Sequence, residues 1–186
     1  MMKVIVNLIM GMLLVAYPFV VFMGLQYLEP RWLAIFLLCI ISIRLLLSKS
    51  LISKMPWLPI ATGLGALLLL FSTTFNSELG ILLYPVAINV AMFAAFGYSL
   101  YKKPSIIEGF ARIREPDLDA QGVRYTEKVT FVWCVFFVLN GSVALYTSLY
   151  MSRDAWTFYN GFLSYVAMGL LFGIEYLIRC YVKRNK

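Results

Sequence analysis

The chain has 186 residues, of which 62% are hydrophobic and 13% are charged, and its mean hydropathy is +0.83. That balance excludes an ordinary soluble domain and favours a single compact domain in a membrane. The net charge of +7 does not indicate nucleic-acid binding. Its cations lie in the breaks between apolar stretches, where membrane topology and anionic head groups explain them.

The residue types that most often carry chemistry are few. Histidine is absent, which removes the commonest general base and zinc ligand. The three cysteines, Cys39, Cys134 and Cys180, lie within or at the end of apolar stretches. Their number is odd and their spacing is wide, so they predict neither a disulfide framework nor a metal site. We expect no cofactor and no catalytic residue.

The apolar stretches predict an all-α, polytopic membrane protein whose residues 1–186 form one transmembrane domain. The first stretch follows Lys3 and is long enough to cross a bilayer, whereas a secretory signal is shorter and ends at a small-residue cleavage site. We interpret it as a retained helix. About six spans are expected: Val4 to Leu28, Trp32 to about Leu47, Trp57 to about Phe75, Leu79 to Tyr101, about Val129 to Met151, and about Trp156 to Tyr181.

The distribution of Lys and Arg predicts the orientation. With the N-terminus inside, 14 of the 16 cations lie on one side and only Arg31 and Arg153 lie on the other. Since cations are retained in the cytoplasm during insertion, we expect a bacterial inner-membrane protein with both termini cytoplasmic. The third stretch is the weakest. If it only re-entered the membrane, six cations between Lys102 and Lys128 would lie outside, which the charge rule disfavours.

The residues at the proposed membrane boundaries agree with this threading. Trp32, Trp57 and Trp156 lie there, where an amphipathic ring is favoured. Pro85 is expected to kink the fourth helix. Three pairs of small residues spaced four apart predict close helix contacts, either within the chain or between protomers. These pairs are Ala61 with Gly65, Ala91 with Ala95, and Gly169 with Gly173.

The polar segment between the fourth and fifth helices predicts a short amphipathic helix on the cytoplasmic surface. Ser105 and Glu108 match a capping box. Ile106, Phe110 and Ile113 recur at helical spacing and Pro116 ends the pattern, as in a helix that lies in the membrane surface with its charged residues pointing elsewhere.

This segment has two interpretations. Its cations can form a docking or lipid head-group platform, made from Lys102, Lys103, Arg112, Arg114, Arg124 and Lys128. Alternatively, the segment only sets the topology, because five acids nearly offset the six cations and a polybasic lipid site needs an excess of cations. The acids are Glu108, Glu115, Asp117, Asp119 and Glu127.

Polar residues also lie within the apolar stretches. Asn89 and Asn140 are about halfway along the fourth and fifth helices, near the bilayer midplane. A buried amide needs a partner, so the two residues either bond across a helix contact or line a polar path. Glu175 and Arg179 share one face of the sixth helix. We expect Glu175 to be held between Arg44 and Arg179, and a proton-coupling role is the alternative.

Several short segments of the C-terminal half form a distinctive set. They are Tyr84 to Asn89, Lys103-Pro104, Phe110 to Leu118, Val123 to Thr126, Val132 to Phe137, Asn140-Gly141 and Tyr159 to Gly161. Together they resemble an uncharacterised family of small bacterial inner-membrane proteins, encoded beside fatty-acid-synthase-like enzymes of aryl polyene production. The Lys-Pro exit from one helix and the Trp-x-x-Phe-Phe motif resemble, more distantly, intracellular septation protein A. Neither resemblance brings a catalytic residue.

Three functions follow as hypotheses. The first is a non-enzymatic membrane scaffold or accessory protein in cell-envelope or aryl polyene lipid biosynthesis, which the resemblance implies, with lipids, biosynthetic enzymes or envelope proteins as partners. The second is a small lipid or polyene transporter or flippase that works as a homo-oligomer. The third is a lipid-modifying enzyme, for which Glu108, Asp117 and Asp119 are the available acids. The septation resemblance implies action through protein contacts. We favour the scaffold.

Overall fold

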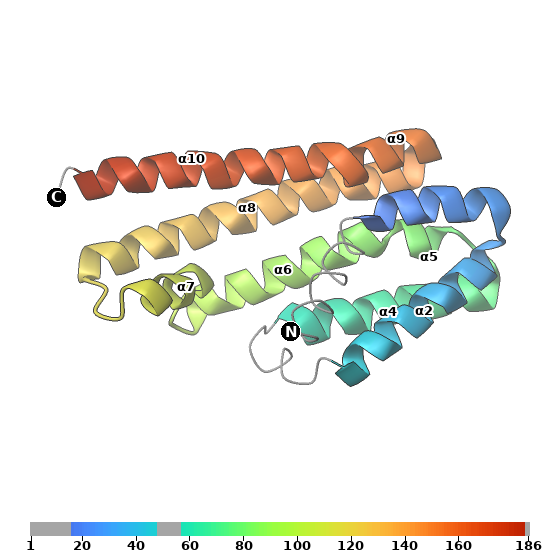
Figure 1. Cartoon of the computed structure of the whole chain (residues 1–186), viewed down its shortest axis with the longest axis horizontal. Coiled ribbons are helices and arrows are strands. Elements are labelled where there is room, and N and C mark those ends of the chain that lie inside the picture. The colour runs from blue at the N-terminus through green and yellow to red at the C-terminus, as the bar shows by residue number, and fades with distance from the viewer. Residues whose placement is uncertain (1–15, 48–56, 185–186) are drawn as a thin grey trace.

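The computed structural model describes residues 16–47 and 57–184, all of whose regular elements are helices (Figure 1). A helix covers residues 16–27. It is followed by α2 (Pro30–Leu47), α4 (Trp57–Phe75), α5 (Leu79–Leu82), α6 (Tyr84–Tyr101), α7 (Ile106–Arg114), α8 (Ala120–Tyr150), α9 (Arg153–Phe158), the π-helix η1 (Tyr159–Leu163) and α10 (Ser164–Arg184). The all-α prediction is confirmed for this part of the chain.

Two helices are long and apolar enough to cross a membrane. They are Ala120–Tyr150, with 31 residues, and Arg153–Val182, with 30 residues. The apolar helices Pro30–Ile43 and Pro59–Phe75 are shorter than the roughly 20 residues that a typical bilayer requires. The expected count of six spans therefore stays a prediction. The part of the first stretch before residue 16 and the break with Lys49 and Lys54 lie outside the described residues.

The long helices lie side by side in the order α2, α4, α6, α8 and α10 (Figure 1). The short helices occupy the two ends. α5, α9 and the turn at Asn76 form one end, called the α9 end. At the opposite end, called the α7 end, α7 packs against α8 and the C-terminus of α10 lies nearby (Figure 1).

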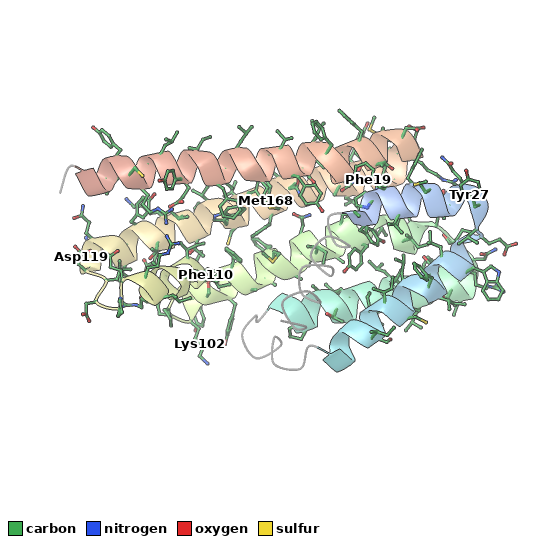
Figure 2. All side chains as sticks on the ribbon, viewed as in Figure 1. Phe19, Tyr27, Lys102, Phe110, Asp119 and Met168 are labelled. Carbon is green, nitrogen blue, oxygen red and sulfur yellow. The ribbon has the colours of Figure 1, made fainter. Side chains whose placement is uncertain are left out.

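Each end has its own hydrophobic core. At the α9 end, Tyr17, Val21 and Leu25 of the first helix pack with residues of α2, α4, α5 and α6 and with Trp156. At the α7 end, Phe96 of α6 packs with Trp133 and Phe137 of α8. Met168 and Leu171 join this second core from α10, and Met168 is labelled between α10 and α8 in Figure 2. The rings of Trp133 and Phe172 are 4.5 Å apart.

The predicted helix ends need three corrections. The fourth helix is not continuous, because a turn at Leu83 separates α5 from α6 and Pro85 lies in the first turn of α6. The fifth helix begins at Ala120 rather than near Val129, since Asp119 caps it by accepting a 2.7 Å hydrogen bond from the Gly122 amide. The sixth begins at Arg153, where Ser152 is the cap.

The predicted short helix is confirmed as α7, and the Ser105 hydroxyl accepts a hydrogen bond from the Glu108 amide. Its position on a membrane surface stays a prediction. Glu108 is only 5% exposed, and its carboxylate pairs with Arg112, one turn further along, at 2.9 Å. The apolar residues Phe110 and Ile113 are the exposed ones.

The interface between α6 and α8 is lined by small and polar side chains. Ala87, Ala91 and Ala95 are buried on α6, and Gly141 and Ala144 are buried on α8. An added Cβ at Gly141 would lie 3.0 Å from the Cβ of Asn89, so this glycine permits the close approach of the two helices. The Ala91 and Ala95 pair therefore serves a contact within the chain.

Candidate functional site: a buried polar network between the helices

Asn89 and Asn140 meet in the interface between α6 and α8. The Asn140 side-chain amide donates a 3.1 Å hydrogen bond to the Asn89 carbonyl oxygen. The Asn89 amide donates to the backbone carbonyl of Pro85 at 2.8 Å. Both side chains are buried. The prediction that the two amides bond across a helix contact is therefore confirmed.

Tyr159 completes this contact from the π-helix. Its hydroxyl donates a 2.9 Å hydrogen bond to the side-chain oxygen of Asn140. The next residue, Asn160, is buried and donates to the Thr147 hydroxyl of α8 at 3.2 Å and to the Trp156 carbonyl at 2.9 Å. A π-helical turn is wider than an α-helical one and occurs often at functional sites. Here, two successive side chains both reach α8.

The joint between α5 and α6 exposes backbone carbonyls that other helices satisfy. Pro85 has no N–H, so the Ile81 carbonyl cannot receive its usual helical hydrogen bond. The Tyr17 hydroxyl donates to that carbonyl instead, at 2.8 Å. A backbone break that is buried requires such replacement partners, because an unpaired buried carbonyl is costly.

The carbonyl of Leu82, the next residue, accepts two hydrogen bonds from the C-terminal half. The Trp156 indole N–H donates to it at 3.0 Å and the Ser148 hydroxyl donates at 2.9 Å. Trp156 is 1% exposed, so its ring packs inside the molecule, and its predicted place at a membrane boundary stays a prediction. Trp32, by contrast, is 60% exposed.

Chemically, this network consists of amides, hydroxyls, an indole and backbone carbonyls. None of these groups is a strong acid or base at neutral pH, and their bonds run between helices that are far apart in the sequence. Such an arrangement fixes helix positions. It is the use expected of single Asn residues in membrane helices.

The predicted tie between Arg44 and Glu175 is wrong. α2, which carries Arg44, lies on the opposite side of the molecule from α10 (Figure 1), because α4, α6 and α8 lie between them. The side chain of Arg44 is outside the described part. Glu175 instead accepts a 3.3 Å hydrogen bond from the Tyr125 hydroxyl of α8. Its pairing with Arg179 is observed, at 3.7 Å.

The predicted surface cations behave in two ways. Lys103 pairs with Glu127, and Arg112 pairs with Glu108. Lys102, Arg114 and Arg124 are exposed and form no ion pair with any residue that the structure describes. The acids considered for an enzyme are also engaged in part, since Glu108 pairs with Arg112 and Asp119 caps α8.

Sequence reasoning missed Tyr159, Asn160 and Trp156 as network members and Tyr125 as the partner of Glu175. Tyr159 and Asn160 were visible only as part of a motif that carried the family resemblance, and no periodicity marks a π-helical turn. Trp156 followed a break in hydropathy, where a boundary position is the usual expectation. Tyr125 lies before the apolar part of α8 and was assigned to a loop.

Among the described residues, no group of three His, Cys, Asp or Glu side chains could hold a metal ion. Cys39, Cys134 and Cys180 are free thiols. Comparison with known proteins finds no matching family model, no similar curated protein and no similar solved structure.

Proposed function

We propose that this chain is a non-enzymatic accessory or scaffold protein of a bacterial inner membrane. It crosses the membrane about six times with both termini in the cytoplasm. Its role is to position or anchor partners in cell-envelope or aryl polyene lipid biosynthesis. The resemblance of the C-terminal half to the polyene-associated family supplies the pathway, and the contacts described above support the mode of action.

The observation that carries this proposal is the set of bonds among Asn89, Asn140 and Tyr159. A transport path needs polar groups that face a passing ligand, whereas these side chains bond to one another and to the Pro85 carbonyl. Together with Trp156, they hold α6, α8 and the sixth span in register. A protein whose polar interior serves packing is suited to present surfaces to partners.

The charges at the two ends support the proposed orientation. Arg31 and Arg153 belong to the α9 end, where they bind the Thr73 carbonyl and Glu78 respectively. The six cations between Lys102 and Lys128 and the C-terminus of α10 belong to the α7 end (Figure 1). The positive-inside rule then makes the α7 end cytoplasmic. A reporter fused after Lys186 tests this orientation, and activity of a periplasmic reporter there would contradict it.

Alanine substitutions test whether the network serves packing or transport. Asn89→Ala and Asn140→Ala are compared with Ser142→Ala, which removes an exposed polar group from the lipid-facing side of α8. Each variant is expressed in a deletion strain, and the amounts of folded protein and of polyene or envelope product are both measured. The scaffold proposal expects output to fall only in proportion to the amount of folded protein.

If output is lost while the folded amount stays constant, transport is the better explanation. A second set of variants tests catalysis, namely Glu108→Gln, Asp117→Asn and Asp119→Asn. We expect output per folded molecule to be retained in all three. Loss of output in a folded Asp117→Asn variant would favour an enzyme, because Asp117 is exposed and its substitution leaves both the Glu108 pair and the α8 cap intact.

A further inference from the structure

The outer face of α7 combines exposed apolar and exposed basic side chains. Phe110 is 61% exposed and Ile113 is 78% exposed. Lys102 and Arg114, which flank this helix in the sequence, are exposed as well. Figure 2 shows the Lys102 and Phe110 side chains at the α7 end of the molecule.

The helix is anchored to the rest of the molecule at its first turn, so this outer face is presented in a fixed position. Ile106 and Ile107 pack against the core of Phe96, Trp133 and Phe137. The Ser105 hydroxyl caps the first turn. The ion pair between Glu108 and Arg112 stabilises the middle of the helix itself, and Arg112 also donates to the Pro116 carbonyl at 2.9 Å.

The ion pairs leave the net charge of this segment unchanged, because each one uses one cation and one acid, but they determine which cations stay without an ion pair. The near equality of six cations and five acids in the sequence argued against a lipid site. In the structure, Glu127 and Glu108 are each paired with a cation, and Asp119 caps α8. Four exposed cations form no ion pair with a described residue: Lys102, Arg114, Arg124 and Lys128. The other acids of the segment, Glu115, Asp117 and Asp119, all lie beyond the end of α7.

The position of α7 along the molecule matches a membrane surface. Lys102 directly follows the last residue of α6, and Lys128 directly precedes the apolar run of α8 that begins at Val129. α7 connects these two points. It therefore lies at the level where two helices leave their apolar zone, which is where head-group phosphates are found.

We propose that α7 and its flanking cations bind anionic phospholipids of the leaflet at the α7 end. Phe110 and Ile113 insert among the upper acyl chains, while Lys102 and Arg114 contact head-group phosphates. An anionic lipid surface fits better than an acidic soluble protein, because the exposed aromatic and aliphatic side chains need an apolar neighbour beside the charges. This inference rests on the proposed membrane-spanning topology.

The full-length protein in detergent is titrated with phosphatidylglycerol and, separately, with phosphatidylcholine, and bound lipids are counted by native mass spectrometry. The decisive variant is Lys102→Gln with Arg114→Gln, which removes two unpaired cations. Its matched control is Lys103→Gln with Arg112→Gln. This control also removes one Lys and one Arg from the segment, but both of these cations take part in ion pairs. Lys103→Gln against Lys102→Gln is the single-substitution comparison if the double control unfolds.

We expect the wild-type protein to prefer phosphatidylglycerol and the decisive variant to bind it roughly tenfold more weakly. The control should stay within about twofold of the wild type, since its cations are already neutralised within the chain. Equal binding of the two lipids, or equal losses in both variants, would overturn the inference. A chain that remains soluble without detergent would instead contradict the membrane topology itself, so the two failures are distinguishable.

Discussion

At the α9 end, Arg31 and Arg153 are bonded within the chain, whereas at the α7 end several cations face outward without an ion pair to any described residue. Arg31 donates to the Thr73 carbonyl at 3.1 Å. Arg153 pairs with Glu78 at 2.6 Å and donates to the Leu25 carbonyl at 3.3 Å. The α7 end also has ion pairs, but it leaves Lys102 and Arg114 exposed beside Phe110 and Ile113. The first end is thus organised for internal cohesion and the second for contact with its surroundings.

The unequal distribution of cations in the sequence is thus matched by a difference in how the two ends of the molecule use them. The two cations expected outside are used to close the turns between helices. The cations expected inside outnumber the ion pairs in which the described ones take part. The same chemical groups therefore stabilise the fold at one end and remain available for partners at the other.

The strongest test of the comparison is Trp156→Ala at the α9 end. The ring is 1% exposed and its N–H bonds the Leu82 carbonyl, so we expect a loss of roughly 3–5 kcal/mol in the free energy of unfolding. Trp32→Ala, which removes a ring that is 60% exposed, should change it by less than about 0.5 kcal/mol. Thermal unfolding in detergent, followed by circular dichroism, gives both values, and equal effects would remove the distinction between a buried and an exposed tryptophan.

Tyr17→Phe removes a single hydroxyl from the same end. The buried Ile81 carbonyl then loses its replacement donor, and we expect destabilisation of about 1–2 kcal/mol. Tyr27→Phe is the control on the same helix, because Tyr27 is exposed. If the two variants unfold at the same temperature, the Tyr17 bond does not contribute to the joint between α5 and α6.

At the α7 end, the pair of Arg112 with Glu108 should behave differently from the neighbouring Arg114. Arg112→Gln leaves a buried carboxylate without its cation. We expect a loss of about 1 kcal/mol, a modest value because the Arg112 side chain is partly exposed and solvent screens the pair. Arg114→Gln should leave the unfolding temperature in detergent unchanged. A large effect of Arg114→Gln would mean that this arginine stabilises the fold rather than facing its surroundings.

The smallest effect is expected for Ile113→Ser on the outer face of α7. In detergent, the free energy of unfolding should change by less than about 0.5 kcal/mol, because this side chain is 78% exposed. Ile107→Ser on the packed side of the same helix should cost more than 1 kcal/mol, since Ile107 joins the α7-end core. Similar losses for both would contradict the two-faced description of α7.

Local signals in the sequence predicted several elements closely. The third stretch was expected from Trp57 to about Phe75 and forms α4 with these bounds. The capping box at Ser105 predicted the start of α7, because a hydroxyl that caps a free amide acts over only three residues. The Asn89 and Asn140 contact was also within reach, since two amides at equal depth on successive helices have few other partners.

Contacts that depend on the relative placement of distant helices were not predictable in this way. The Arg44 tie failed because residues at a similar depth need not lie on neighbouring helices, and here three helices separate them. The early start of α8 was missed because hydropathy marks where a helix enters lipid and not where it begins. The π-helical turn at Tyr159 leaves no mark in the spacing of apolar residues, so its contact with Asn140 emerged only from the fold.

The joint between α5 and α6 has a consequence for how the protein is made. The donors that satisfy the Ile81 and Leu82 carbonyls come from Tyr17, synthesised long before them, and from Ser148 and Trp156, synthesised long after. During translation the Ile81 carbonyl can find its donor at once, whereas the Leu82 carbonyl must wait for Ser148 and Trp156. A chain that ends before Ser148 would therefore leave the buried Leu82 carbonyl without these two donors, which is unfavourable for folding.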